Sequence, residues 1–224
     1  MRASVVIPNW NGVDLLPTCL DSLRRQTERA FETIVVDNAS TDASVELINR
    51  DYPEVRVVAL DRNRGFTGGV NAGIMAARGE VVALLNTDVE AHPRWLEAVL
   101  SAFEDDPRVG MVASRIMLFD RRHVFNSAGD QYGRDGIPRN RGVWEEDRGQ
   151  YSRREYVFGP CGGAAAYRKS VLLDAGLFDE RLFMYLEDVD LAWRAQSLGY
   201  RCLYEPEAVV YHRLSATGGG TLAS

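Results

Sequence analysis

The sequence predicts an α/β fold with a doubly wound, mostly parallel central sheet and a smaller mixed C-terminal region. In the first half, short β-branched runs alternate with segments whose apolar residues recur every three or four positions. Residues 81–85 form an unbroken apolar run, which is typical of a strand buried on both faces. Beyond residue 120 the alternation gives way to a stretch rich in arginine, glycine and aspartate. We therefore expect one domain over residues 1–214, with a doubly wound half (1–115) and a mixed half (116–214).

The apolar pattern of the first half places its elements in order. Strands are expected at residues 4–7, 33–36, 55–60, 81–85 and 109–113. Helices between them are marked by apolar residues on one face: Leu16, Cys19, Leu20 and Leu23, then Val45 and Ile48, then Val70, Ile74 and Ala77, then Leu96, Val99, Leu100 and Phe103. Thr41 and Asp42 suit the cap of the second helix, and Pro93 suits the first turn of the fourth.

The second half carries weaker periodicity. Residues 120–155 are expected to form a long excursion, with a two-stranded ribbon as one arrangement. Strands are then expected at 164–167, 200–204 and 208–211, with a short helix at 169–175 and a longer one beginning at Glu187. Residues 215–224 are small and glycine-rich, and we expect a flexible tail there.

Composition excludes some classes of function. Net charge is −6, from 26 basic and 32 acidic residues, which argues against nucleic acid as a partner. The three cysteines have no metal-ligand spacing and predict a reducing, cytoplasmic compartment without disulfides. We expect no signal peptide, and no apolar segment approaches the length of a membrane span. Arginine-rich clusters between residues 121 and 154 leave peripheral contact with the inner face of a membrane open.

Polar side chains follow three of the predicted parallel strands. They are Asn9 and Asn11, then Asp37 and Asn38, then Asn86, Thr87 and Asp88. Carboxyl ends of parallel strands share one edge of a sheet, where open α/β sheets bind ligands. Together the three clusters favour a nucleotide site, although Asp88 alone would equally fit a cap of the turn before Pro93.

The negative charge of the phosphates of such a ligand must be neutralised, and the sequence has no glycine-rich phosphate-binding loop for this. No G-x-G-x-x-G follows the first strand, and no phosphate-binding G-x-x-x-x-G-K-[ST] occurs. A divalent cation, Mg²⁺ or Mn²⁺, is the obvious alternative, with Asp88 as one ligand and His212 as a second candidate. His212 alone also fits a structural histidine. Glu187 and Asp188 fit the role of a general base. They equally fit acidic residues that stabilise a helix N-terminus, and the preferences of helix termini do not decide between these two roles.

Six segments, in order, resemble family 2 glycosyltransferases of the GT-A fold, in particular the rhamnosyltransferase-like subgroup of bacterial cell-surface polysaccharide synthesis. The segments are V-V-I-P-N-W-N-G, V-V-D-N-A-S-T-D, N-R-G-F-T-G-G-V-N-A-G-I, L-L-N-T-D-V, G-G-A-A-A-Y-R and F-D-E-R-L-F-M-Y-L-E-D-V-D-L-A-W-R. The resemblance implies an inverting, metal-dependent transfer from a dTDP- or UDP-sugar to a glycan or lipid-linked acceptor. It also implies that residues 1–115 bind the nucleotide sugar and that residues 116–214 bind the acceptor and carry the catalytic residues.

The resemblance also implies roles for individual residues. Asp188, with Glu187 beside it, matches the catalytic base, and Asp88 and His212 match metal ligands for Mg²⁺ or Mn²⁺. Gly162, Gly163 and Trp193 are expected to shape the sugar and acceptor pocket, with residues 120–155 as a lid or acceptor loop. The residues implied for nucleotide-sugar binding are Pro8, Asn9, Asn11, Asp37, Asn38, Asn63, Gly65, Asn71, Asn86 and Thr87.

Two positions depart from the family pattern. Asn86 replaces the first carboxylate of a metal-binding D-x-D, which leaves Asp88 as its only acid. Asn38 stands where many relatives have a second aspartate, so either Asp37 or Asn38 could read the base. The alternatives are a sugar nucleotidyltransferase, which would show a glycine-rich basic loop that residues 8–12 lack, and a non-catalytic nucleotide-sugar or glycan-binding module. Keeping both Asp88 and the acidic pair 187–188 speaks against the latter.

Overall fold

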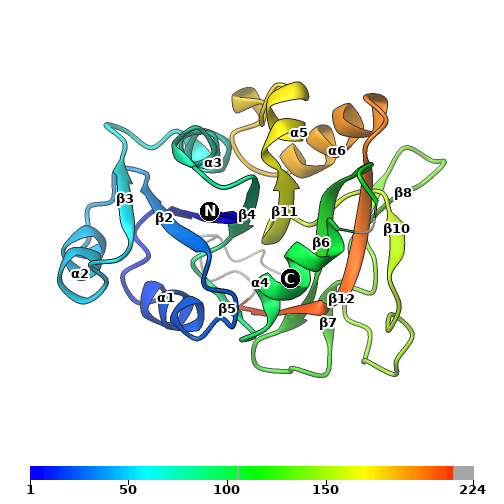
Figure 1. Cartoon of the computed structure of the whole chain (residues 1–224), viewed down its shortest axis with the longest axis horizontal. Coiled ribbons are helices and arrows are strands. Elements are labelled where there is room, and N and C mark those ends of the chain that lie inside the picture. The colour runs from blue at the N-terminus through cyan, green and yellow to red at the C-terminus, as the bar shows by residue number, and fades with distance from the viewer. Residues whose placement is uncertain (105, 214–224) are drawn as a thin grey trace, which may run out of the picture.

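A ten-stranded mixed sheet runs through the whole molecule (Figure 1). The computed structural model describes residues 1–104 and 106–213. The sheet order is β10 (Glu155–Val157), β12 (Arg201–His212), β6 (Val109–Leu118), β11 (Ala164–Arg168), β4 (Val81–Leu85), β1 (Ala3–Asn9), β2 (Phe31–Asp37) and β3 (Arg56–Ala59). Two short strands join its side, with β5 (Val89–Ala91) on β12 and β7 (Phe125–Ser127) on β6.

The N-terminal half is the predicted doubly wound unit. Strands β4, β1, β2 and β3 pair in parallel. Helices α1 (Leu16–Arg24), α2 (Ser44–Asp51) and α4 (Trp95–Ala102) cover one face. Helices α3 (Gly65–Ala76), α5 (Lys169–Asp174) and α6 (Glu187–Ser197) cover the other. Alternate residues of β1 and β4 enter the two cores, which explains the continuous apolar runs of these strands.

The C-terminal half mixes strand directions. Strand β11 pairs antiparallel with both β4 and β6, and β12 pairs parallel with β6. The two strands predicted at 200–204 and 208–211 are one strand, β12, with a register shift between Glu205 and Val209. Pro206 lies at this irregularity and cannot donate a ladder hydrogen bond, which explains why the pattern read as two strands.

The excursion at 120–155 contains the predicted ribbon. Strands β8 (Asp130–Tyr132) and β9 (Pro138–Asn140) form a separate two-stranded sheet. Strand β5, which has only three residues, was not predicted.

Two helix starts differ from expectation, and the predicted tail falls outside the description. Helix α4 begins at Trp95, two residues after Pro93. Ala43 precedes α2, although Asp42 accepts the N–H of Ser44 at 3.0 Å. The tail at 215–224 lies outside the described residues.

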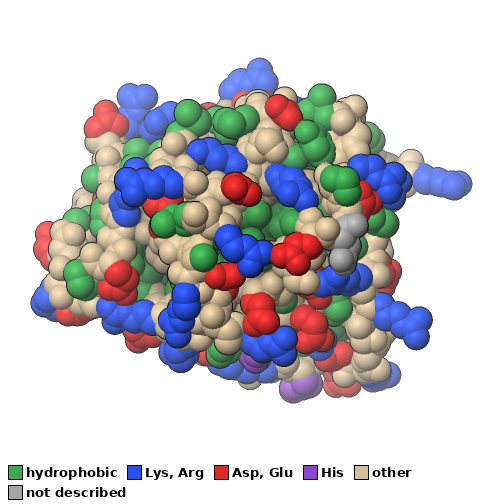
Figure 2. All heavy atoms as spheres, in the orientation of Figure 1, with side chains coloured by type: hydrophobic (Ala, Val, Ile, Leu, Met, Phe, Trp, Pro, Cys, Tyr) green, Lys and Arg blue, Asp and Glu red, His purple; other side chains and the backbone are tan. Residues whose placement is uncertain are grey.

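The described part of the chain has a charge-mixed surface and no membrane-spanning helix. Basic and acidic side chains are interspersed on the face shown in Figure 2, which agrees with the modest net charge of −6. No helix within 1–104 or 106–213 is long and apolar enough to cross a membrane.

Candidate active site

The polar ends of β1 and β2 meet side by side. The strand register pairs Asn9 with Asp37, and Asn9 Nδ2 donates to Asp37 Oδ1 at 3.2 Å and to Ser40 Oγ at 3.1 Å. Asp37 Oδ2 accepts the N–H of Ser40 at 3.2 Å. Asn11, with φ of 53°, accepts the N–H of Thr41 at 2.8 Å. These bonds fix both strand-end turns against each other, and Pro8 lies against the neighbouring helix α3 at Gly69.

Asn38 braces the loop that precedes α3. Its Oδ1 accepts the N–H of Arg64 and its Nδ2 donates to the carbonyl of Gly65, both at 2.8 Å. Asn63 Oδ1 accepts the N–H of Gly65, also at 2.8 Å. Gly65 has φ of 72°, which favours glycine. Since both ends of the Asn38 amide are engaged by this loop, Asp37 is the better candidate of the two to read a base.

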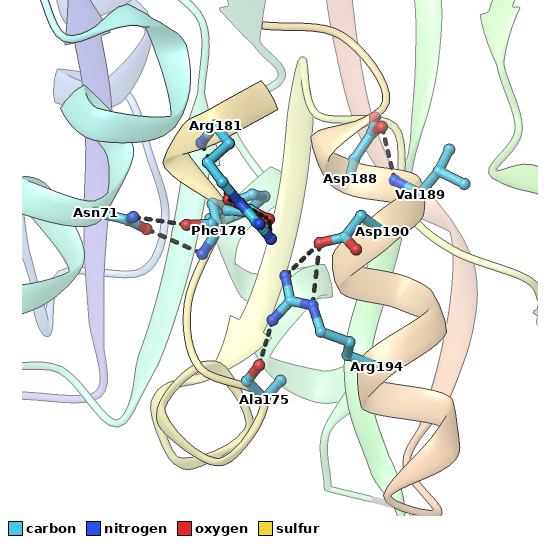
Figure 3. A network of polar contacts seen from close by, with 9 residues as sticks. Asn71, Ala175, Phe178, Arg181, Asp188, Val189, Asp190 and Arg194 are labelled. Carbon is cyan, nitrogen blue, oxygen red and sulfur yellow. Dashed lines mark hydrogen bonds and ion pairs between the residues drawn. The ribbon is translucent and has the colours of Figure 1, made fainter. Parts of the chain in front are cut away.

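Asn71 makes a different contact from the one expected. Its Nδ2 donates to the carbonyl of Phe178 at 2.9 Å, and its Oδ1 accepts the N–H of Phe178 at 3.1 Å (Figure 3). The side chain is buried, and both ends of the amide are bound to the backbone of Phe178. Asn71 thus ties α3 to the segment that leads towards α6, and its contact with the nucleotide stays a prediction.

Asp88 and His212 meet at the end of β4. The first follows Asn86 and Thr87, and its carboxylate is almost completely buried. His212 ends β12, and its Nε2 lies 3.2 Å from Asp88 Oδ1. The other ring nitrogen, Nδ1, lies 2.8 Å from Oδ1 of Asn126 on β7. If Asn126 accepts the Nδ1 proton, Nε2 presents a lone pair beside a carboxylate oxygen, and a cation or a proton between them would relieve the repulsion.

The Asp88–His212 pair suits a divalent cation whose remaining ligands come from the substrate. Within the described ranges no group of three or more His, Cys, Asp and Glu side chains could hold a metal. Mg²⁺ and Mn²⁺ sites for phosphate substrates often use only one or two protein ligands, with phosphate oxygens supplying others. Asp88 offers a hard oxygen and His212 an imidazole, a set compatible with either ion.

The acidic pair opens α6, with Glu187 buried and Asp188 partly buried. Asp188 Oδ2 accepts the N–H of Gly162 at 2.9 Å. Its Oδ1 accepts the N–H of Val189 at 2.8 Å (Figure 3). Burial raises the pKa of Asp188 above its ordinary value, against the opposing effect of these hydrogen bonds. Burial and the neighbouring Asp188 charge raise the pKa of Glu187 to about 7.

The dipeptide Gly162–Gly163 joins the acidic pair to the metal-candidate pair. A Cβ atom on Gly162 would lie 3.4 Å from Asp188 Oδ2. One on Gly163 would lie 3.7 Å from Cε1 of His212 and 3.8 Å from Nδ2 of Asn86. The carbonyl of Gly163 also accepts the N–H of Asn86 at 3.1 Å. Residues from β4, β12 and α6 therefore surround one short stretch of backbone and form one site.

A match to a protein-family model shows to which family the chain belongs. The family model described as "Glycosyl transferase family 2" matches residues 4–175. The chain belongs to glycosyl transferase family 2. It is also 33% identical over 239 residues to the N-acetylglucosaminyl-diphospho-decaprenol L-rhamnosyltransferase of Mycobacterium tuberculosis H37Rv, covering 96% of this chain and 77% of that protein.

Solved structures show the GT-A fold for this family 2 glycosyltransferase. GalNAc-T7 with UDP, GalNAc and Mn²⁺ superimposes with a TM-score of 0.79 at 18% identity, over 95% of this chain and 44% of the other. The Pyrobaculum calidifontis mannosyltransferase PcManGT with GDP-Man and Mn²⁺ gives 0.69 at 22% identity, over 97% and 58%. By its family the chain is a glycosyl-transferring enzyme, as the motifs predicted. The nucleotidyltransferase and binding-module alternatives are set aside.

Trp193 of this glycosyltransferase belongs to an exposed aromatic cluster. Its ring centroid lies 5.0 Å from that of Tyr132 and 5.6 Å from that of Phe158. Trp193 is 47% exposed, so it is a surface residue of α6 and not part of the core. Tyr132 and Phe158 could not be recognised in advance, because both lie near or within the aperiodic excursion.

Two further site residues were missed by sequence reasoning. Asn126 lies on β7 beside His212, and Asp130 begins β8. Asp130 is buried, and its Oδ1 has no hydrogen-bond partner among the described residues. Burial, together with the charge of Asp188, raises the pKa of Asp130 to about 8. The only signal for either residue was its position in N-S-A-G-D, between two family motifs.

Proposed function

We propose that this enzyme is an inverting, divalent-metal-dependent glycosyltransferase that moves a sugar from a nucleotide diphosphate to an acceptor hydroxyl. The observation that carries the proposal is the Gly162–Gly163 dipeptide. It lies between the Asp188 carboxylate and His212, the partner of Asp88, so the proposed base and the proposed metal pair flank the same two residues. Such an arrangement suits one displacement with the base on one side and the leaving diphosphate on the other.

The nucleotide would bind along the carboxyl ends of β1 and β2. Asp37 retains accepting capacity after its bonds to Asn9 and Ser40, since each carboxylate oxygen has two lone pairs. We assign it the recognition of the base, which makes a uracil or thymine nucleotide, and so a UDP- or dTDP-sugar, the expected donor. Asn63 and Gly65, held by Asn38, would shape the adjoining wall.

Asp88 and His212 would hold the cation, with Asn86 and Thr87 beside them. A bound Mg²⁺ or Mn²⁺ supplies neutralisation of the charge that builds on the departing diphosphate. In support, two proteins of the same fold are described with Mn²⁺ together with UDP or GDP-Man. With Asn86 in place of a carboxylate, His212 takes on a larger share of the binding than it would beside two acids.

Asp188 would act as the general base. It accepts the proton of the acceptor hydroxyl while that oxygen bonds to the anomeric carbon, and the bond from this carbon to the diphosphate oxygen breaks on the opposite face. One displacement inverts the configuration, so no protein nucleophile is needed. Burial raises the pKa of the Cys161 thiol, which keeps it protonated and unreactive.

The acceptor is proposed to be a lipid-linked glycan in cell-surface polysaccharide assembly at the inner face of the cell membrane. This rests on the Mycobacterium tuberculosis relative, which is named for a diphospho-decaprenol acceptor. The exposed Tyr132 and Trp193 rings, with the partly buried Phe158 between them and the core, offer apolar faces on which sugar C–H groups could stack.

Release of nucleoside diphosphate from UDP- and dTDP-sugars with Mn²⁺ tests the proposal. Asp188→Asn should lower the turnover number by about 10²–10⁴-fold, the usual contribution of a general base. Asp190→Asn is the matched control, because Asp190 lies on the same helix but pairs with Arg194 at 2.6 Å (Figure 3). Full turnover in Asp188→Asn would sink the assignment of the base.

A further inference from the structure

Five consecutive apolar residues, Leu182–Leu186, stand exposed directly before the acidic pair. Their side chains have exposed fractions between 38% and 70%. The run reads L-F-M-Y-L and contains no charged residue. Single apolar residues on a surface are ordinary, but a contiguous exposed run marks contact with a partner, a membrane or a ligand.

The backbone of this segment is strained as well as exposed. Phe183, Tyr185 and Leu186 have φ of 56°, 73° and 64°. Residues with a side chain beyond Cβ rarely adopt this left-handed region, and a segment that only needed to turn would use glycine or asparagine. Strained conformations of this kind cluster at functional sites, where surrounding contacts hold them.

Contacts from both sides of the active site hold the segment in place. The carbonyl of Phe183 accepts the N–H of Thr67 at 3.2 Å. The Phe183 ring lies against Gly65, where a Cβ atom would be 2.5 Å from Cδ2. At the other end the carbonyl of Leu186 accepts the N–H of Asp190 on α6 at 3.0 Å. The segment therefore runs from the proposed nucleotide loop to the proposed base.

We propose that Leu182–Leu186 binds the hydrocarbon chain of a lipid-linked acceptor whose sugar presents its hydroxyl to Asp188. The inference rests on the proposed function. A glycan needs hydrogen-bonding side chains, and this run offers only apolar ones apart from the Tyr185 hydroxyl; a hydrocarbon chain needs none. The acceptor must reach Asp188, and this run is the apolar surface that adjoins it in the chain. The decaprenol in the name of the mycobacterial relative is a lipid of this chemistry.

The test removes apolar surface without changing the backbone. Asparagine tolerates the left-handed region, so Tyr185→Asn with Leu186→Asn keeps the turn and removes the two most exposed side chains of the run. Leu173→Asn is the matched control, since Leu173 is 50% exposed on α5. Met184→Gln, at a position without positive φ, is a second variant for the case that the double variant does not fold.

The measurement is equilibrium binding of a long-chain polyprenyl diphosphate and of isopentenyl diphosphate in the same detergent, without donor or metal. The wild type should prefer the long chain by about tenfold or more, because each apolar side chain that the chain covers adds to affinity. The double variant should lose that preference, and Met184→Gln part of it, while affinity for the short probe stays unchanged. Leu173→Asn should behave as wild type.

Three results would overturn the inference. The first is a wild type that binds the long-chain and the short-chain diphosphate with equal affinity. The second is a double variant that loses the same affinity for both probes. The third is binding to vesicles without polyprenyl lipid that is as tight as binding to the long-chain probe and depends on the same side chains. The last would mean a general membrane surface. The binding assay needs no sugar transfer, so a negative result in it would not affect the role proposed for Asp188. Full turnover of Asp188→Asn, in turn, would not change lipid binding, so the two failures can be told apart.

Discussion

The Nε2 atom of His212 lies 3.2 Å from Oδ1 of Asp88, although the two residues lie far apart in the sequence. Strand β5 explains the approach. It begins at Val89, immediately after Asp88, and pairs antiparallel with β12 so that Val89 stands opposite His212. A strand of only three residues thus brings the candidate metal pair together.

Removal of either member of the pair should weaken binding of Mn²⁺. We expect Asp88→Asn and His212→Ala each to lower Mn²⁺ affinity in the presence of a nucleoside diphosphate by about 100-fold or more, since loss of an outer partner alone costs about 10–100-fold. Electron paramagnetic resonance of free Mn²⁺ measures this directly. His123→Ala, an exposed histidine on another loop, should leave the affinity unchanged. Wild-type affinity in His212→Ala would exclude it as a ligand.

Asn126 should matter through the orientation of the imidazole. Asn126→Leu removes the contact to Nδ1 and should lower Mn²⁺ affinity by about 10–100-fold. Asn126→Asp keeps an acceptor at this position and should retain or improve the affinity. Equal losses in the two variants, measured by the same titration, would show that Asn126 acts only by packing.

Gly65 should tolerate no side chain. A Cβ atom would meet Phe183 at 2.5 Å and force a residue with φ of 72° into strain, so Gly65→Ala should lower the free energy of unfolding by about 2–5 kcal/mol. Gly136→Ala is the control, with φ of 77° but no atom within 4 Å, and should cost only about 1–2 kcal/mol. Urea unfolding of both variants gives the comparison; equal losses would mean that Phe183 moves aside freely.

Asp130 should make the fold less stable as pH rises. Its pKa of about 8 exceeds the value of about 3.8 for an unperturbed aspartate, so between these limits the folded state binds more protons than the unfolded one. The contribution of Asp130 to the free energy of unfolding then falls with rising pH, by at most about 1.4 kcal/mol per pH unit. Asp130→Asn should remove that slope, so its stability relative to wild type should grow from pH 5 to pH 8 in urea unfolding. A difference independent of pH would contradict the buried, protonated state.

Most of the fold could be read from the sequence, because strands buried on both faces leave continuous apolar runs and their helices leave one-sided ones. The parallel β4, β1 and β2 were predicted in this way, and so was the common edge for Asn9 and Asp37. β5 escaped notice because three residues carry no usable period. β12 was divided because Pro206 interrupts its pattern where the register shifts.

Candidate site residues within a sequence motif could be predicted. Residues whose role depends on tertiary contacts could not. Asp188 and Asp88 were predicted from motifs, and the structure places Asp188 against Gly162 and His212, the partner of Asp88, against Gly163. The bracing of Asn71 could not be foreseen, because its partner is a peptide group distant in sequence. Asn126 and Asp130 come from an aperiodic excursion, where only the folded chain shows which side chains turn towards the site.

The configuration of the product at the anomeric carbon tests the single-displacement account most directly. Transfer from a UDP- or dTDP-sugar of known configuration, followed by proton NMR of the new glycosidic linkage, should give the inverted anomer and a rate that depends on Asp188. A retained anomer would require a second displacement or another mechanism, and would contradict the assignment of Asp188 as the base of a one-step transfer.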